Sequence, residues 1–141
     1  MSEFKVGRLD HVHVAVKDRA AAIRWYRDVL GLEKHSDHQE EGDPRGPVVL
    51  SSDNGETHLA LFESKGNITP AQIIAFRVDA DSFMAFLARL GELKLYALGR
   101  PVMQKDVADH GNSWSIYFCD PDGNPYEITT YEHSEIAKRL R

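Results

Sequence analysis

The stretch His11-Val12-His13-Val14-Ala15-Val16-Lys17-Asp18 decides the fold. Its three valines alternate with His11, His13 and Ala15, and this period of two is typical of a β-strand with one apolar face. Asp18 breaks the alternation at a position where an aspartate can cap the N-terminus of a helix. The stretch therefore predicts a strand that leads directly into a helix and turns two histidines away from the core.

A helix and a hairpin are predicted after this strand. Apolar side chains at helical spacing run from Ala20 to Leu30, and Gly31 stands where a helix C-cap is expected. A short extended segment and a polar loop from Asp37 to Gly46 come next. The hairpin consists of two runs, Pro47 to Ser52 and Thr57 to Glu63, that turn at Asp53-Asn54-Gly55. The first half thus predicts a strand, a helix and three further strands.

The second half repeats this order, which indicates an internal duplication. Ile74, Phe76 and Val78 alternate as in the first strand, and a helical stripe from Phe83 to Leu90 is expected to end at Gly91. Two more runs, Ser113 to Cys119 and Tyr126 to Tyr131, are predicted to form a closing hairpin. The turn between them is Asp120-Pro121-Asp122-Gly123-Asn124. Each half alone is too small to bury its sheet face, so we expect the two to pack as one unit.

Composition limits the possible partners. The chain has 141 residues, of which 42% are apolar, enough for a core and about the size of one domain. Seventeen Lys and Arg against 22 Asp and Glu give a net charge of −5, which excludes a generic basic nucleic-acid-binding surface. The single Cys119 cannot form an intrachain disulfide, and neither a signal peptide nor an apolar run of roughly 20 residues is present. We expect a cytoplasmic protein with a small-molecule substrate and no membrane partner.

Strand alternation also predicts which side chains face away from the core. His11 and His13 do so on the first strand, and His58, Ala60 and Phe62 do so on the strand that closes the first half. In the second half the same face carries Tyr117 on one closing strand and Glu127 on the other. Three histidines, a glutamate, a tyrosine and a phenylalanine suit a concave site better than a plain solvent face.

Three stretches together resemble the vicinal oxygen chelate superfamily, which includes glyoxalase I, methylmalonyl-CoA epimerase, fosfomycin- and bleomycin-resistance proteins and type I extradiol dioxygenases. Leu9 to Asp18 resembles its opening strand, and Trp25 to Glu33 resembles the end of its first helix. Tyr117 to Glu127 resembles its closing hairpin. The resemblance implies an α+β fold of two β-α-β-β-β modules whose strands form a curved, partly closed mixed sheet around a cavity. It implies one domain over residues 9–131, with modules at about 9–64 and 70–131, followed by a short C-terminal helix in 132–141. Members of this length are commonly homodimers, so a homodimer is expected.

The resemblance also implies a metal site. His11 and Glu127 match the histidine and glutamate that hold a divalent ion in the family, with Fe²⁺ or Mn²⁺ favoured and Zn²⁺ or Ni²⁺ possible. Two other customary ligand positions carry Ile73 and Ala60, unless a register slip brings in Gln72. His58 is the candidate that completes the ligand set, and His13 is an alternative. His13, Phe62 and Arg77 are candidate substrate contacts.

A second set of residues resembles the extradiol dioxygenases. In those enzymes a histidine and a tyrosine flank the bound catechol, and here His110 and Tyr117 precede Asp120-Pro121-Asp122-Gly123 and Glu127 in the same order. The histidine can shuttle a proton near neutral pH and the tyrosine can hydrogen-bond a substrate oxygen. The resemblance therefore favours a metal-dependent ring-cleaving dioxygenase that acts on a catechol-like small molecule. Two alternatives stay open, a glyoxalase- or epimerase-type lyase or isomerase, and a metal-free binding protein like the bleomycin-resistance proteins.

Overall fold

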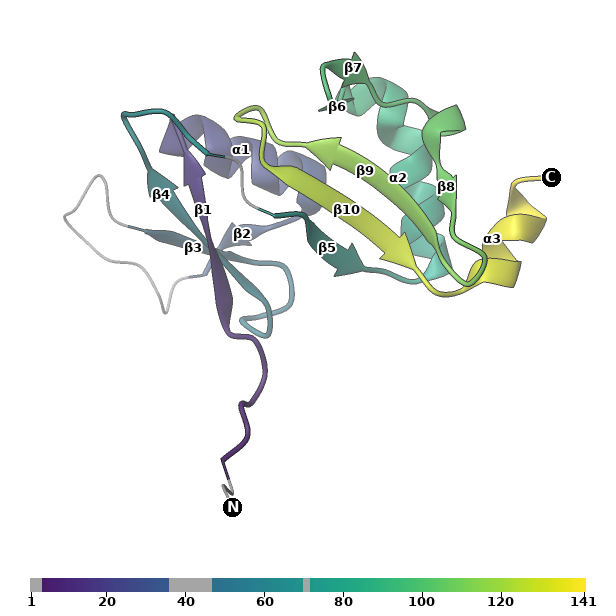
Figure 1. The fold of residues 1–141 in the computed structure, drawn as a ribbon, viewed down its shortest axis with the longest axis horizontal. Coiled ribbons are helices and arrows are strands. Elements are labelled where there is room, and N and C mark those ends of the chain that lie inside the picture. The colour runs from purple at the N-terminus through teal and green to yellow at the C-terminus, as the bar shows by residue number, and fades with distance from the viewer. Residues whose placement is uncertain (1–3, 36–46, 70–71) are drawn as a thin grey trace. The chain divides into compact units, whose positions relative to one another are not determined.

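The chain folds as two compact units. The computed structural model describes residues 4–35, 47–69 and 72–141, and the expected polar loop from Asp37 to Gly46 lies outside them. Contacts group into unit 1, Met1–Ile68, and unit 2, Thr69–Arg141. Each unit combines a mixed sheet with helices in the predicted order, so the α+β class and the duplicated module are confirmed (Figure 1).

Unit 1 is the simpler module. Within its described residues four strands form a sheet in the order β1-β4-β3-β2, in which β1 and β4 run parallel and the other neighbours antiparallel. Helix α1 lies across one face of this sheet (Figure 1). The elements are β1 (His11–Val16), α1 (Arg19–Leu30), β2 (Glu33–Lys34), β3 (Val48–Ser51) and β4 (His58–Glu63).

Both ends of α1 are capped by the residues that the sequence indicated. The Asp18 carboxylate accepts a hydrogen bond from the Ala21 N–H at 3.0 Å. At the other end Gly31 adopts the left-handed conformation with φ +68°, which glycine reaches without a steric penalty. These caps fix where the chain leaves β1 and where it returns toward the sheet.

The core of unit 1 lies between α1 and the sheet. Val14 and Val16 of β1 and Leu59 and Leu61 of β4 are almost completely buried there. Burying one such side chain contributes about 1.5–3 kcal/mol to folding, so the alternation sets the register of both strands. The histidines of β1 are consequently held on the opposite face of the sheet.

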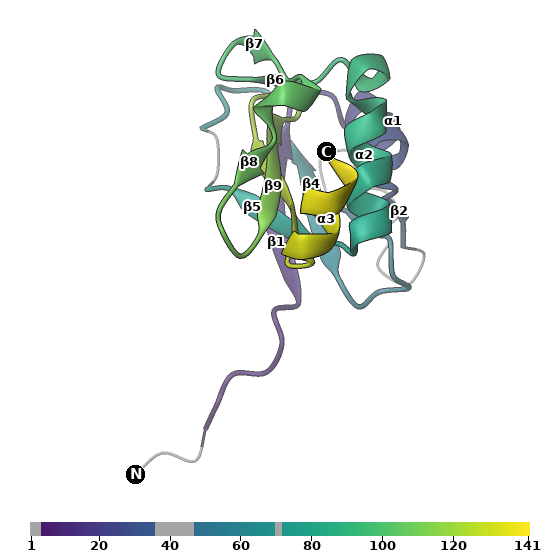
Figure 2. The ribbon, with the colours of Figure 1, turned by 90° about the vertical axis from the view of Figure 1, so that its right-hand side faces the viewer.

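Unit 2 has the same plan with extra short strands. Within its described residues the strand order is β5-β10-β9-β6-β7, β8 also pairs with β9, and β5 runs parallel to β10. Helix α2 lies along the sheet, with α3 packed beside it (Figure 2). The elements are β5 (Ile74–Arg77), α2 (Ala80–Leu93), β6 (Tyr96–Ala97), β7 (Arg100–Pro101), the 3-10 turn η2 (Gln104–Asp106), β8 (Ala108–Asp109), β9 (Trp114–Cys119), β10 (Pro125–Thr130) and α3 (His133–Arg139).

The expectation that α2 ends at Gly91 is wrong. The helix continues to Leu93 and is closed by Lys94, which takes the left-handed conformation and donates its N–H to the Leu90 carbonyl. Leu90 directly before the glycine and Leu95 just after the helix are both buried, so the chain on either side of Gly91 is held against the core of unit 2. A single glycine lowers helix propensity by about 1 kcal/mol, which such burial outweighs.

The hairpin between β9 and β10 is organised by one buried carboxylate. Asp120 accepts hydrogen bonds from the N–H groups of Asp122 and Asn124 and from the Asn124 side-chain amide, at 2.8 to 2.9 Å. Gly123 supplies the positive φ that the turn requires. This turn fixes the pairing of β10 with β9.

Among the described residues no helix is long and apolar enough to cross a membrane.

Candidate functional site

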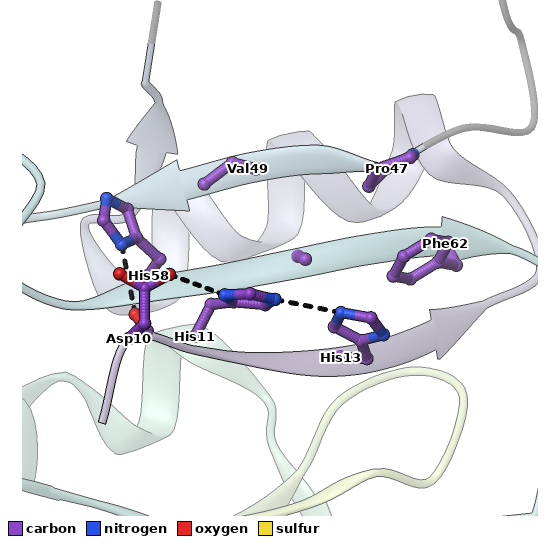
Figure 3. Close-up of a pocket in the computed structure, with 8 residues that line it drawn as sticks. Asp10, His11, His13, Pro47, Val49, His58 and Phe62 are labelled. Carbon is purple, nitrogen blue, oxygen red and sulfur yellow. Dashed lines mark hydrogen bonds and ion pairs between the residues drawn. The ribbon is translucent and has the colours of Figure 1, made fainter. Parts of the chain in front are cut away.

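The face of unit 1 opposite α1 carries a hollow lined with imidazole rings. Side chains of β1, β4 and β3 that share this face are placed side by side by the strand register, which sets His11 beside His58 and His13 beside Ala60. The hollow has a volume of about 150 Å³. Figure 3 shows the lining residues, which are Asp10, His11, His13, Pro47, Val49, His58, Ala60 and Phe62.

Asp10, His11 and His13 form a chain of hydrogen bonds across this hollow. His11 Nδ1 lies 2.6 Å from the Asp10 carboxylate, and His11 Nε2 lies 3.1 Å from His13 Nε2 (Figure 3). An ionised carboxylate only accepts, so His11 donates through Nδ1–H. The Nε2 atom of neutral His11 then carries a lone pair that accepts from the Nε2–H of His13. Asp10 thereby selects the tautomer of His11, and the Nε2 atom of that ring faces His13 in the hollow.

His13 and His58 pack against different aromatic rings. His13 lies against Phe62, with ring centroids 4.5 Å apart. The buried His58 instead directs Nδ1 to the Asp10 carbonyl at 3.1 Å and packs 5.4 Å from the His35 ring. The sequence therefore predicted the shared face of these residues, whereas the direction of each ring is set by its neighbours.

In unit 2 the face opposite α2 carries the predicted carboxylate. Glu127 on β10 is paired with Tyr117 on β9 and with Ala75 on β5, so the three side chains lie in one row. The hydroxyl of fully buried Ser115 donates to Glu127 Oε2 at 2.7 Å, and Ser115 Oγ also lies 3.1 Å from Thr129 Oγ1. A hydroxyl-to-carboxylate bond of this length is charge-assisted and holds the Glu127 side chain in one orientation.

His110 and Tyr117 meet on this unit. His110 lies on the loop between β8 and β9, where its N–H donates to the Ser113 carbonyl, and its Nε2 atom lies 3.0 Å from the Tyr117 hydroxyl. The structure thus brings together the histidine and tyrosine that the sequence separated by seven positions. Tyr117 is also a register neighbour of Glu127, so an acid–base pair and a carboxylate share one sheet face.

A second histidine of unit 2 is tied to the same loop. His133 Nε2 lies 2.7 Å from Asp109 Oδ1, and its ring stacks on Trp114. The Gly111 N–H and then the His133 side chain hold the pKa of Asp109 below its usual value, because both favour the ionised carboxylate. These bonds anchor the two ends of the segment that carries His110.

Arg77 lies beside this row at the end of β5. It is the register partner of Thr129, and its guanidinium sits 4.7 Å above the ring of Tyr131, an arrangement typical of a cation–π contact. A separate cavity of about 450 Å³ lies next to Tyr117 and is bordered by the cations Arg100 and Lys105. Unit 2 therefore offers positive charge on both sides of its polar face.

The candidate metal ligands are imidazole nitrogens and a carboxylate. Among the described residues there is no cluster of three or more His, Cys, Asp or Glu side chains that could hold an ion. Unit 1 nevertheless supplies two imidazole nitrogens in hydrogen-bond contact, and unit 2 supplies an oriented carboxylate. Imidazole and carboxylate are the ligands that Fe²⁺ and Zn²⁺ commonly take, so the donor types fit such an ion. Ile73 and Ala60 are apolar at the two other positions considered and offer no ligand.

Two supporting residues were missed from the sequence. Asp10 directly precedes His11, and a carboxylate next to a candidate ligand histidine could have signalled its partner. Ser115 lies on the same strand face as Tyr117, but nothing in the alternation indicates that its hydroxyl reaches Glu127. Such pairings depend on cross-strand register, which only the folded sheet defines.

Known proteins similar to this chain were then compared with it. Residues 8–128 match the model of the Glyoxalase/Bleomycin resistance protein/Dioxygenase superfamily. The metallothiol transferase FosB of Staphylococcus epidermidis is 31% identical over 89% of this chain and 83% of its own length. Biphenyl-2,3-diol 1,2-dioxygenase 3 of Rhodococcus globerulus is 28% identical over 91% of this chain and 71% of its length.

A solved structure agrees with these sequence matches. The oxidase ChaP-H2 superimposes with a TM-score of 0.68 at 30% identity, and the match covers 89% of this chain and 94% of that one. The relatives carry the names of enzymes with different reactions, a transferase, a dioxygenase and an oxidase. The chain belongs to the glyoxalase/bleomycin resistance protein/dioxygenase superfamily.

Proposed function

We propose that this protein is a metal-dependent enzyme that cleaves the ring of a catechol-like small molecule with dioxygen, in the extradiol manner. The observation that carries the proposal is the contact of 3.0 Å between His110 Nε2 and the Tyr117 hydroxyl, on the sheet face that also bears Glu127. A proton acceptor, a phenol and a carboxylate on one face suit a substrate with two neighbouring hydroxyls. The sequence similarity to a biphenyldiol dioxygenase and to an oxidase supports a reaction that consumes dioxygen.

The proposed metal ligands follow from the family resemblance. They are His11 and Glu127, with His58 as the further ligand, and Fe²⁺ or Mn²⁺ is favoured over Zn²⁺ or Ni²⁺. A bound divalent ion supplies Lewis acidity toward two adjacent substrate oxygens. Ser115 keeps the Glu127 carboxylate in one orientation through its 2.7 Å bond, and Asp10 does the same for the His11 ring.

The remaining residues act on the substrate. His110 accepts a proton at Nε2 from a ring hydroxyl, since a neutral imidazole is a base near physiological pH. The Tyr117 hydroxyl hydrogen-bonds a substrate oxygen and holds the ring toward that nitrogen. In this proposal Arg77, His13 and Phe62 contact the substrate, the first through charge and the last through its apolar ring.

The test is oxygen uptake by the full-length protein. Protein loaded anaerobically with Fe²⁺ is mixed with a panel of catechols and exposed to air, and we expect oxygen consumption with formation of yellow ring-opened products. Tyr117→Phe and His110→Gln should lower kcat by about 10²–10⁴-fold, the usual contribution of a positioned acid or base. Tyr96→Phe, an exposed tyrosine on β6, is the matched control and should keep full activity. No oxygen uptake with any catechol would contradict the proposal.

Metallothiol transfer is the second candidate. The FosB relative shares 31% identity, and the cavity bordered by Arg100 and Lys105 suits an anionic co-substrate. Consumption of a thiol in the presence of Mn²⁺ and a small anionic electrophile would favour it over ring cleavage. A lyase or isomerase would show neither oxygen nor thiol consumption, and a metal-free binding protein would retain no ion after loading.

A further inference from the structure

We infer that His13 binds the divalent ion together with His11, so that β1 supplies two imidazole ligands from one strand. The inference rests on the proposed function, which requires an ion, and it gives His13 the ligand role proposed above for His58 in place of a substrate contact. All residues that carry it lie in unit 1 and line the hollow shown in Figure 3.

The first argument is the distance between the two nitrogens. His11 and His13 alternate with buried valines, so both rings leave β1 on the same face, and their Nε2 atoms are 3.1 Å apart. Two nitrogens that each lie about 2.0–2.1 Å from one ion are separated by about 2.9–3.4 Å at octahedral to tetrahedral angles. The observed separation falls within this range, so one ion can take both nitrogens with little movement of the strand.

The second argument is the support behind each ring. The Asp10 carboxylate lies 2.6 Å from His11 Nδ1, and a carboxylate that holds the far nitrogen of a histidine is the usual partner of a metal-binding imidazole. His13 is held by its ring contact with Phe62 at 4.5 Å. Both rings are therefore positioned before an ion arrives, which lowers the conformational entropy lost on binding.

The third argument favours His13 over His58 as the additional ligand. The ring of His58 packs against His35, with ring centroids 5.4 Å apart. Figure 3 shows the His58 ring at the Asp10 end of the hollow, while the ring of His11 points toward His13. His13 is the imidazole that already contacts the free nitrogen of His11.

Ion binding changes the proton position on one ring. When both rings are neutral, His13 donates through Nε2–H to His11 Nε2, whereas a ligand nitrogen must carry a lone pair. His13 therefore moves its proton to Nδ1 when the ion binds, and His11 keeps its proton on Nδ1. Because imidazole suits Fe²⁺, Zn²⁺ and Ni²⁺ better than Mn²⁺, a two-imidazole strand disfavours Mn²⁺ among the ions proposed above.

The experiment observes both rings directly. The full-length, uniformly ¹⁵N-labelled protein is titrated with Zn²⁺, and long-range ¹H–¹⁵N spectra record the ring nitrogens of every histidine. We expect His11 and His13 to change together at one equivalent of Zn²⁺, each to the pattern of a metal-bound Nε2 with a protonated Nδ1.

Affinity measurements on variants complete the test. His13→Gln and His11→Gln should each weaken Zn²⁺ binding at least about tenfold in a competition titration. Even the loss of a side chain that only hydrogen-bonds a metal ligand lowers metal affinity by about 10–100-fold. His35→Gln removes an imidazole of the same unit outside the pair and should bind Zn²⁺ as the wild type does. Circular dichroism identifies any variant that fails to fold, and Asp10→Asn then serves as a milder probe of the same pair.

The possible outcomes separate the two proposals. A response of His11 alone, with unchanged affinity of His13→Gln, overturns the inference and leaves the proposed function intact. Joint response of both rings without oxygen uptake on any catechol supports the inference and overturns the proposed function. Absence of Zn²⁺ binding to the wild-type protein overturns both.

Discussion

At the residue scale, the carboxylate of Glu127 depends on one hydroxyl. Ser115→Ala removes the donor that lies 2.7 Å from Glu127 Oε2, so the carboxylate gains rotational freedom. We expect metal affinity to fall about 10–100-fold, as for other outer partners of a ligand, with a loss of about 1 kcal/mol in unfolding free energy.

A competition titration and urea unfolding measure the two effects of Ser115→Ala separately. Thr129→Val is the matched control, because it removes a neighbouring hydroxyl but leaves the Ser115–Glu127 bond in place. A loss of stability without a loss of metal affinity would show that Ser115 is only structural.

The sequence predicts which face of a strand each side chain lies on, but not the direction in which the side chain then points. The alternation of Val12, Val14 and Val16 places His11 and His13 on the same side because the pleat has a period of two. It does not tell which way a ring turns on that side. His58 shares the face, but its ring is directed to a backbone carbonyl, and that rotamer depends on Asp10 and His35, which come from other segments.

At the element scale, the start of α2 is sensitive to pH. Asp79 caps α2, and its carboxylate accepts a hydrogen bond from the Ser82 N–H at 2.8 Å. The Ser82 N–H and hydroxyl, together with the charge of Arg139, hold the pKa of the Asp79 carboxyl below its usual value. A carboxyl with a lowered pKa in the folded state stabilises the fold above the unfolded value and loses that contribution as pH falls through the folded value. Asp79→Ala should therefore be less stable than the wild type at neutral pH, and this difference should shrink below about pH 4, the usual pKa of an aspartate.

Urea midpoints followed by circular dichroism at several pH values test this expectation for Asp79. Asp79→Asn can still cap the helix through its amide oxygen, so its stability relative to Asp79→Ala should be independent of pH in this range. A gap between wild type and Asp79→Ala that stays constant into the acid range contradicts the assignment of the cap to the ionised carboxylate.

Elements themselves were predicted well where local chemistry determines them. Asp18, Gly31 and the turn at Asp53-Asn54-Gly55 mark boundaries through hydrogen bonds and positive φ angles that are local to the chain. Gly91 misled because the end of α2 is set by burial of Leu90 and Leu95 against the rest of unit 2. Such tertiary contacts override a propensity of about 1 kcal/mol, and no local pattern reports them.

At the scale of the whole molecule, each unit leaves its opening strand at the border of its sheet. Among the described strands, β1 pairs with β4 and β5 pairs with β10, so each opening strand stands last in the strand order of its own sheet. Three large apolar side chains before β1, those of Phe4, Val6 and Leu9, are also strongly exposed. Edge strands and exposed apolar side chains are both typical of surfaces that associate.

We therefore expect a homodimer in solution, with a mass about twice the 15.9 kDa of one chain by light scattering at micromolar concentration. Phe4→Ser with Val6→Ser should shift this equilibrium toward the monomer, because burial of both side chains would contribute roughly 3–6 kcal/mol per chain. Leu98→Ser, at an exposed hairpin turn of unit 2, is the control and should leave the mass unchanged. A wild-type mass of one chain contradicts the dimer, and a dimer unaffected by the double substitution assigns its contact to the strand edges instead.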